Sequence, residues 1–137
     1  AFNNLVGFYV IENNQGTVLD EFGNALNPGD NGYAQAAITR RAFELNRNTT
    51  EAQQFTGGNL LAPFIIANGT AQEFLSQNPN NQQGEDPLAY FSFLGANPDG
   101  VEHIRLVDEN TFGFEDLFGG GDNDFDDLLF RAEFEVA

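Results

Sequence analysis

The sequence contains no cysteine, so neither a disulfide framework nor thiolate chemistry is available to it. Basic residues are also scarce, because five Lys and Arg stand against 21 Asp and Glu and the net charge is −16. A charge of this size and sign opposes binding to nucleic acid or to an anionic membrane surface. No stretch is long and apolar enough to span a bilayer. A single histidine, His103, leaves no ligand set for zinc.

The chain has 137 residues, which is enough for one domain with its own core. Nearly all of its aromatic residues are Phe, and this favours a packed interior over disorder. The sequence begins at Ala1 and contains no signal-peptide pattern. We therefore expect residues 1–137 to be a single module excised from a larger surface protein, and a monomer in isolation.

Short apolar or alternating segments predict a series of β-strands. These segments cover residues 5–12, 17–19, 60–67, 88–94, 101–107 and 128–136. Both faces of the first segment, Leu5–Glu12, are largely apolar, which is typical of a central strand. Pro63 lies inside the third segment and predicts an edge strand, because proline cannot donate a ladder hydrogen bond.

Two helices are expected among these strands. Asp30 is a candidate N-cap for a helix from about Gly32 to Leu45. Thr70 and Glu73 have the spacing of a capping box, which predicts the start of a second, short helix. Many short strands with one or two short helices predict a mainly β fold, a β-sandwich.

The most distinctive stretch is the acidic segment, Phe114–Leu128, which carries six carboxylates and no Lys or Arg. Close carboxylates repel each other by roughly 1 kcal/mol per pair even in water. Such a cluster either remains solvated or binds a hard cation. Ca²⁺ takes about six to eight oxygen ligands, whereas Mg²⁺ tends to retain water. We therefore expect a bound Ca²⁺, and the alternative is a solvated acidic turn.

Within the acidic segment, three aspartates follow a D-x-D-x-x-D pattern after three glycines, whose backbone can adopt positive φ. The spacing is not that of an EF-hand. An extended backbone with a bend at Phe125 would gather the three aspartates, and the two acidic residues before the glycines would add further oxygens. The predicted metal ligands are Glu115, Asp116, Asp122, Asp124 and Asp127.

The acidic segment resembles the C-terminal signature of a bacterial domain family of unknown function. Three further stretches resemble that family, namely residues 5–10, 26–37 and 90–103, and Phe118 departs from it where Pro is common. The family occurs in large secreted and surface proteins, notably cyanobacterial proteins and marine adhesins of the repeats-in-toxin type. The resemblance implies a secreted, calcium-dependent, β-rich module without an established activity.

Residues near the acidic segment are candidates for ligand contacts. His103 and Arg105 lie on the same face of a predicted strand, and Asn123 lies within the acidic segment. A histidine near carboxylates can hold an anionic ligand or act as a base, but a lone strand histidine is more often a surface or pocket-wall residue. One histidine and scattered Ser and Thr define no catalytic triad, and clustered metal-binding Asp residues are poor acid–base pairs. We therefore expect no enzymatic activity.

These features together predict a calcium-dependent ligand-binding module of a bacterial extracellular protein, used in adhesion. Its partner would be a peptide or glycan on another cell or surface, captured at or near the bound Ca²⁺. The alternative is a structural module that calcium stiffens within a long surface protein and that has no ligand of its own. The sequence does not separate the two hypotheses, because an open and a closed metal shell use the same residue types.

Overall fold

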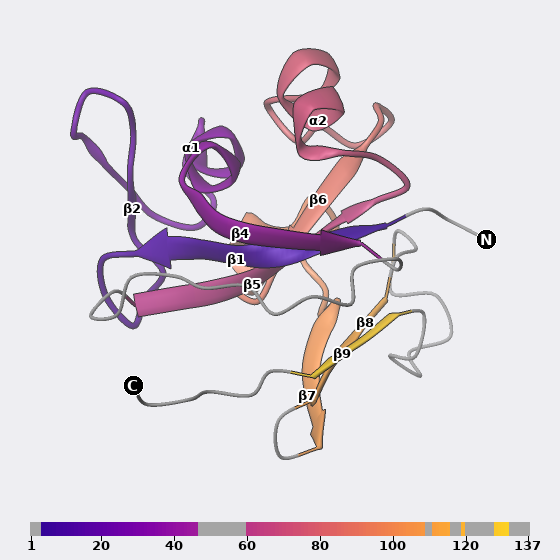
Figure 1. Cartoon of the computed structure of the whole chain (residues 1–137). Coiled ribbons are helices and arrows are strands. Elements are labelled where there is room, and N and C mark those ends of the chain that lie inside the picture. The colour runs from indigo at the N-terminus through magenta and orange to yellow at the C-terminus, as the bar shows by residue number, and fades with distance from the viewer. Residues whose placement is uncertain (1–3, 47–59, 109–110, 116–118, 120–127, 132–137) are drawn as a thin grey trace.

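The computed structural model of the chain describes residues 4–46, 60–108, 111–115, 119 and 128–131 (Figure 1). Its elements in chain order are β1 Leu5–Ile11, β2 Val18–Leu19, β3 Ala25–Leu26, α1 Tyr33–Thr39, β4 Arg41–Asn46, β5 Leu60–Ala67, α2 Ala71–Gln77, β6 Leu88–Phe91, the 3-10 helix η1 Leu94–Ala96, β7 Ile104–Asp108, β8 Thr111–Phe114 and β9 Leu128–Arg131. The protein is therefore mainly β with two short α-helices, as the sequence predicts.

The described strands form three sheets. The largest has the order β4-β1-β5-β6, a second contains β7-β8-β9, and the short β2 and β3 pair with each other. All of the pairs are antiparallel. β1 lies between β4 and β5, so the prediction of a central first strand is confirmed.

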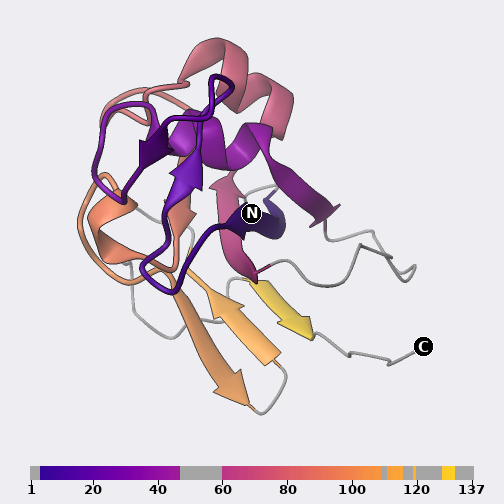
Figure 2. The same cartoon turned by 90° about the vertical axis from the view of Figure 1, so that its left-hand side faces the viewer.

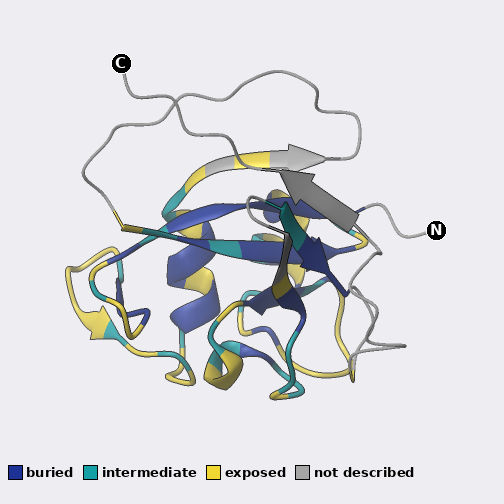
Figure 3. Ribbon diagram, turned by 90° about the horizontal axis from the view of Figure 1, so that it is seen from below, coloured by how far each residue is buried: buried dark blue, intermediate teal, exposed yellow. Residues whose placement is uncertain are grey.

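Both faces of the four-stranded sheet are covered. Figures 1 and 2 show α1 and α2 on one side of it and the β7-β8-β9 sheet on the other. Along β1, Leu5 and Tyr9 belong to the core under the helices, whereas Val6 belongs to the core shared with β7 and β8. This alternation explains why the first strand is apolar on both faces. The deepest burial follows this sheet and the inner sides of the helices (Figure 3).

The first helix is shorter than the sequence predicts. It ends at Thr39, and residues 41–46 form β4, which pairs with β1 through a register that shifts between Phe8 and Tyr9. The predicted N-cap is also wrong, because Gly32 with φ 85° occupies that position. The Asp30 carboxylate instead accepts a hydrogen bond from the backbone N–H of Asn27. Pairing with the open edge of β1 therefore overrides the helical spacing of the sequence.

The prediction that Leu60–Ala67 is an edge strand is wrong, because β5 lies between β1 and β6. The physical reasoning nevertheless holds at Pro63 itself. β6 pairs only with Phe64–Ala67 of β5, whereas Pro63 pairs with Phe8 of β1. In the described part of the chain, β5 thus has one neighbour at the level of the proline, where a missing donor is tolerated.

The second helix begins as predicted. The Thr70 side chain accepts a hydrogen bond from the Glu73 backbone N–H at 3.1 Å, and the Glu73 carboxylate accepts one from the Thr70 N–H at 3.0 Å. The capping box is therefore confirmed.

Two buried tyrosines link α1 to the central strand. The Tyr33 hydroxyl donates to the Gly16 carbonyl at 2.6 Å, so at the 3.0 Å contact between the two hydroxyls the Tyr9 O–H is the donor. Burial raises the pKa of Tyr33 to about 12 and raises the pKa of Tyr9 further, with the neighbouring Tyr33 contributing to the second shift. Both tyrosine hydroxyl groups must therefore stay protonated for the core to remain intact.

We predict that alkaline pH destabilises the protein through these two tyrosines. Because an unfolded tyrosine ionises near pH 10 while the folded residues stay protonated, the free energy of unfolding should fall as pH rises from about 10 toward 12. The slope should be about 1.4 kcal/mol per pH unit for each tyrosine. Denaturant titrations at several pH values measure this slope. The double variant Tyr9→Phe/Tyr33→Phe should lose it, and an equal slope in both proteins would refute the assignment.

Candidate functional site

Only one of the predicted metal ligands lies in the described part of the chain. Glu115 directly follows β8 and is fully buried. Asp116, Asp122, Asp124 and Asp127 lie outside the described residues, as does Asn123. Among the described residues, no group of three or more His, Cys, Asp or Glu is arranged to hold a metal ion. The proposed Ca²⁺ site therefore stays a prediction, and the structure shows how two backbone positions of the acidic segment, Glu115 and Gly119, are held.

The first position, Glu115, is held by His103, which lies one residue before β7. The backbone N–H of Glu115 donates to the His103 carbonyl at 2.8 Å. The His103 ring makes a second hydrogen bond to the same residue, because its Nδ1 lies 2.7 Å from the Glu115 carbonyl oxygen. These two bonds extend the β7–β8 pairing beyond the pair Ile104–Phe114. Near the start of the acidic segment, the backbone of Glu115 is therefore held by both the side chain and the main chain of His103.

The second position, Gly119, is held by Asp99, which lies in the turn between η1 and β7. Its Oδ2 accepts a hydrogen bond from the backbone N–H of Gly119 at 2.7 Å. The same oxygen lies 2.6 Å from His103 Nε2, and the Asp99 side chain is only 3% exposed. Asp99 and His103 therefore form one buried unit, which we call the bracket. It contacts the acidic segment at Glu115 and again at Gly119.

The turn that carries Asp99 is held by a buried asparagine. Asn97 accepts a hydrogen bond from the Phe91 N–H at 2.6 Å and donates to the carbonyls of Phe91 and Val101. Gly100, with φ 68°, closes the turn through its N–H to the Asn97 carbonyl. Asp99 itself accepts a second backbone bond, from Val101, through Oδ1. The turn that carries Asp99 is thus fixed to the end of β6 on one side and to Val101, before β7, on the other.

The partners of the His103 ring determine where its protons lie. A carbonyl oxygen can only accept, so Nδ1 carries a proton. A further proton lies between Nε2 and Asp99 Oδ2, which makes the pair a charge-assisted hydrogen bond. Tyr90 stacks on the imidazole with ring centroids 3.6 Å apart and an interplanar angle of 13°. The Tyr90 ring thus covers one face of the imidazole, which is fully buried.

The two ligand-flanking candidates differ in exposure. His103 is completely buried, with each ring nitrogen bonded within the protein. Arg105 is exposed, and its Nε donates to the Glu102 carboxylate at 2.6 Å. A role of either residue, or of Asn123, in ligand contact stays a prediction. In this structure the histidine acts on the acidic segment itself.

Sequence reasoning missed two members of this site. Asp99 lies in an Asn-Pro-Asp-Gly turn and is explained there by turn chemistry alone. Its position four residues before the only histidine is the one signal that pointed to a pair. Tyr90 is buried in β6 and has no sequence signal for stacking on a residue 13 positions away.

Comparison with protein families gives one match. Residues 55–135 match the model of a domain of unknown function, DUF4114, and the match covers more than half of the chain. The chain belongs to this family. The DUF4114 match includes the whole bracket and the acidic segment. Residues 5–10 and 26–37, which also showed the resemblance, lie before it.

Comparisons with curated proteins and with solved structures return no match. Within the described residues, none of the helices has the length and apolar character needed to cross a membrane.

We predict that removing the Asp99 carboxylate destabilises the fold. Asp99→Ala leaves His103 Nε2 buried without its acidic partner, so the free energy of unfolding should fall by about 3–5 kcal/mol. Chemical denaturation measures the change. Asp86→Ala is the control because Asp86 is exposed, and it should change stability by about 0.5 kcal/mol or less. Equal stability of the two variants would contradict the bracket.

Proposed function

We propose that this DUF4114 protein is a calcium-dependent ligand-binding module of a bacterial extracellular protein, used in adhesion. Glu115, Asp116, Asp122, Asp124 and Asp127 would supply the oxygens that hold Ca²⁺. A peptide or glycan on another cell or surface would be captured at or near the ion. The observation that supports this proposal best is the bracket, because it anchors the start and the middle of the acidic segment.

Attachment to the bracket matters for a cation site because ordering an unattached chain segment around an ion costs conformational entropy. Glu115 and Gly119 are four residues apart, and each makes a hydrogen bond of 2.7 Å to the bracket. Both flanks of residues 116–118 are therefore attached to the bracket before any ion binds. Of the proposed ligands, Asp116 lies between these two residues in the sequence, and Asp122 lies three residues after Gly119. A site that is partly ordered in advance binds its ion more tightly.

Charge also favours the proposal. A net charge of −16 on 137 residues produces strong self-repulsion in the folded state. Each bound Ca²⁺ neutralises two charges at the most acidic stretch of the chain. A protein that works among abundant divalent cations tolerates this composition, in agreement with an extracellular location.

A second candidate function is a structural module that Ca²⁺ stiffens and that has no ligand of its own. The burial of His103 and Glu115 favours it, because both residues lie inside the protein at the base of the acidic segment. An ion held there would secure the β7-β8-β9 sheet. The two functions share the metal ligands and differ only in whether one coordination position of the ion is open to a ligand.

We predict that calcium stabilises the protein and that magnesium does so less. An ion at a hundred times its dissociation constant adds about 2.7 kcal/mol to the free energy of unfolding. The melting temperature should therefore rise by several degrees in calcium relative to chelator. Asp124→Ala should lose most of this shift, while the exposed control Asp86→Ala should keep it. Coincident melting curves of the unmodified protein in calcium and in chelator would rule out the metal site.

Peptide and glycan arrays, probed in millimolar calcium and again in chelator, separate the two functions. Binding that disappears with chelator and with Asp124→Ala supports ligand capture at an open ion. A calcium-stabilised protein that binds nothing on either array supports the structural module.

A further inference from the structure

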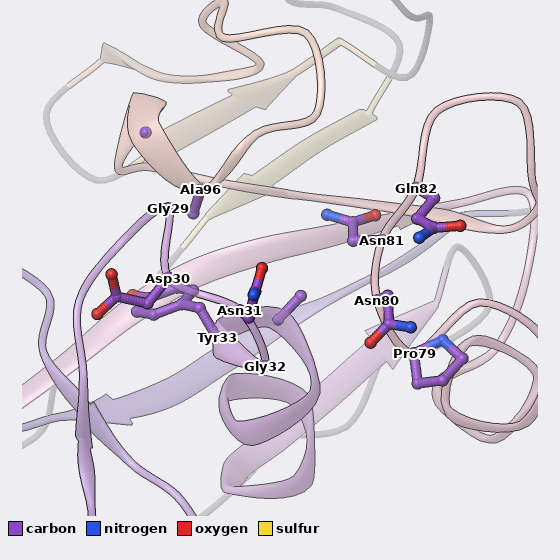
Figure 4. Close-up of a pocket in the computed structure, with 12 residues that line it drawn as sticks. Gly29, Asp30, Asn31, Gly32, Tyr33, Pro79, Asn80, Asn81, Gln82 and Ala96 are labelled. Carbon is purple, nitrogen blue, oxygen red and sulfur yellow. The ribbon is translucent and has the colours of Figure 1, made fainter.

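Two hollows adjoin each other at the start of α1, on the helix-covered side of the protein. The first has a volume of about 520 Å³ and lies between the turn 29–33 and the loop 79–82 (Figure 4). The second has a volume of about 630 Å³ and lies between the β2–β3 hairpin and α1. Asn31 and Gly32 line both, so the two hollows are next to each other. Each volume lies in the range of about 300–1,000 Å³ that is usual for small-molecule sites.

The first hollow carries amide side chains on opposite walls. Asn31 comes from the turn before α1, while Asn80 and Gln82 come from the loop after α2 (Figure 4). All three are exposed, and none of these amides makes a hydrogen bond within the described part of the structure. An amide offers two donors and one carbonyl acceptor, which is the combination that matches a hydroxyl group.

The loop that carries two of these amides is held in place by two buried asparagines. Asn81 donates to the Ala89 carbonyl at 2.7 Å and accepts from the Ala89 N–H at 2.9 Å. Asn78 accepts from the Gln82 N–H and donates to the Pro87 carbonyl at 3.0 Å. The backbone under Asn80 and Gln82 is therefore fixed before a ligand arrives, which lowers the entropic cost of binding.

The second hollow is bordered by an aromatic ring. Phe22 lies in the turn of the β2–β3 hairpin and is 80% exposed, more than any other large apolar residue in the described part of the chain. The Asp20 carboxylate holds this turn by accepting from the backbone N–H groups of Phe22 and Asn24 at 2.9 and 2.8 Å. The Asn24 backbone bond is the largest cause that lowers the pKa of Asp20. An apolar ring is thus presented to solvent on an ordered turn.

Charge restricts the class of ligand. Asp20, Glu21 and Asp30 line the hollows, so an anionic ligand is repelled. Arg40, which lines the second hollow, lies 3.9 Å from the Glu12 carboxylate. A ligand that fits both an aromatic ring and several amides needs an apolar face and a rim of hydroxyl groups. Neutral sugars have this combination.

We propose that the two hollows bind a short neutral saccharide. The ring of Phe22 packs against the apolar C–H face of one sugar unit, while the amides of Asn31, Asn80 and Gln82 bond the hydroxyls of the next. The described residues that line the hollows come from outside the acidic segment. Saccharide binding here therefore needs no metal and does not depend on the calcium site proposed above.

The test is a titration of ¹⁵N-labelled protein with cellotriose, maltotriose and chitotriose at millimolar concentration. At least one trisaccharide should shift the amide signals of Phe22, Asn31, Asn80 and Gln82, and should do so in calcium and in chelator alike. Phe22→Ala should weaken binding roughly tenfold through the lost ring contact. Gln82→Ala should weaken it several-fold through the lost hydrogen bonds.

Matched controls come from exposed residues that do not line the hollows. Leu60→Ala removes an exposed apolar side chain, and Gln83→Ala removes an exposed amide next to Gln82. Both should bind as the unmodified protein does. Three outcomes each overturn the proposal: no shift with any of the trisaccharides, shifts confined to other residues, or equal affinity of Phe22→Ala and Leu60→Ala. Binding lost in chelator from a protein that stays folded would assign the saccharide to the calcium site instead.

Discussion

The pairing of Asp99 with His103 is the interaction on which the C-terminal half of the structure depends. Three parts of the chain meet there: the turn before β7, the residue that follows β8 and the backbone at Gly119. Burial makes this pairing effective, since neither side chain has water to replace a lost partner. It also makes the pairing demanding, because a buried charge without its counterpart costs several kcal/mol. The acidic segment is thus attached to a rigid part of the protein rather than to a flexible one.

Local sequence signals predicted those elements whose chemistry is contained in a few neighbouring residues. The capping box at Thr70 needs only Glu73, and the apolar β1 needs only its own alternation. The predicted extent of α1 was wrong because residues 41–46 form β4 by pairing with β1, which lies some 30 residues earlier in the chain. The prediction of an edge strand from Pro63 was wrong for the same reason. The proline indicates only that β5 has no second neighbour at that residue, and not that the whole strand lies at the edge.

In the candidate site, too, the part with a local sequence signal was predicted and the part that depends on distant contacts was not. Composition alone drew attention to the acidic segment, because clustered carboxylates need solvent or a cation wherever they lie. The bracket was not predictable, because a buried Asp99 and a surface turn residue have the same sequence signature. The buried asparagines are a further example. Asn78, Asn81 and Asn97 lie in loops and turns, where polar side chains are usually solvated, but each bonds backbone groups of neighbouring segments inside the protein.

The bond between His103 and the Glu115 carbonyl has a consequence for strand alignment. In an antiparallel pair that carbonyl would ordinarily accept from a main-chain N–H, and here an imidazole nitrogen takes that place. Only one residue in the chain can provide it, because the sequence has a single histidine. Sliding β8 along β7 by one residue would separate the ring from its acceptor and turn every side chain of β8 to the opposite face. The ring therefore fixes the register in which β8 pairs with β7.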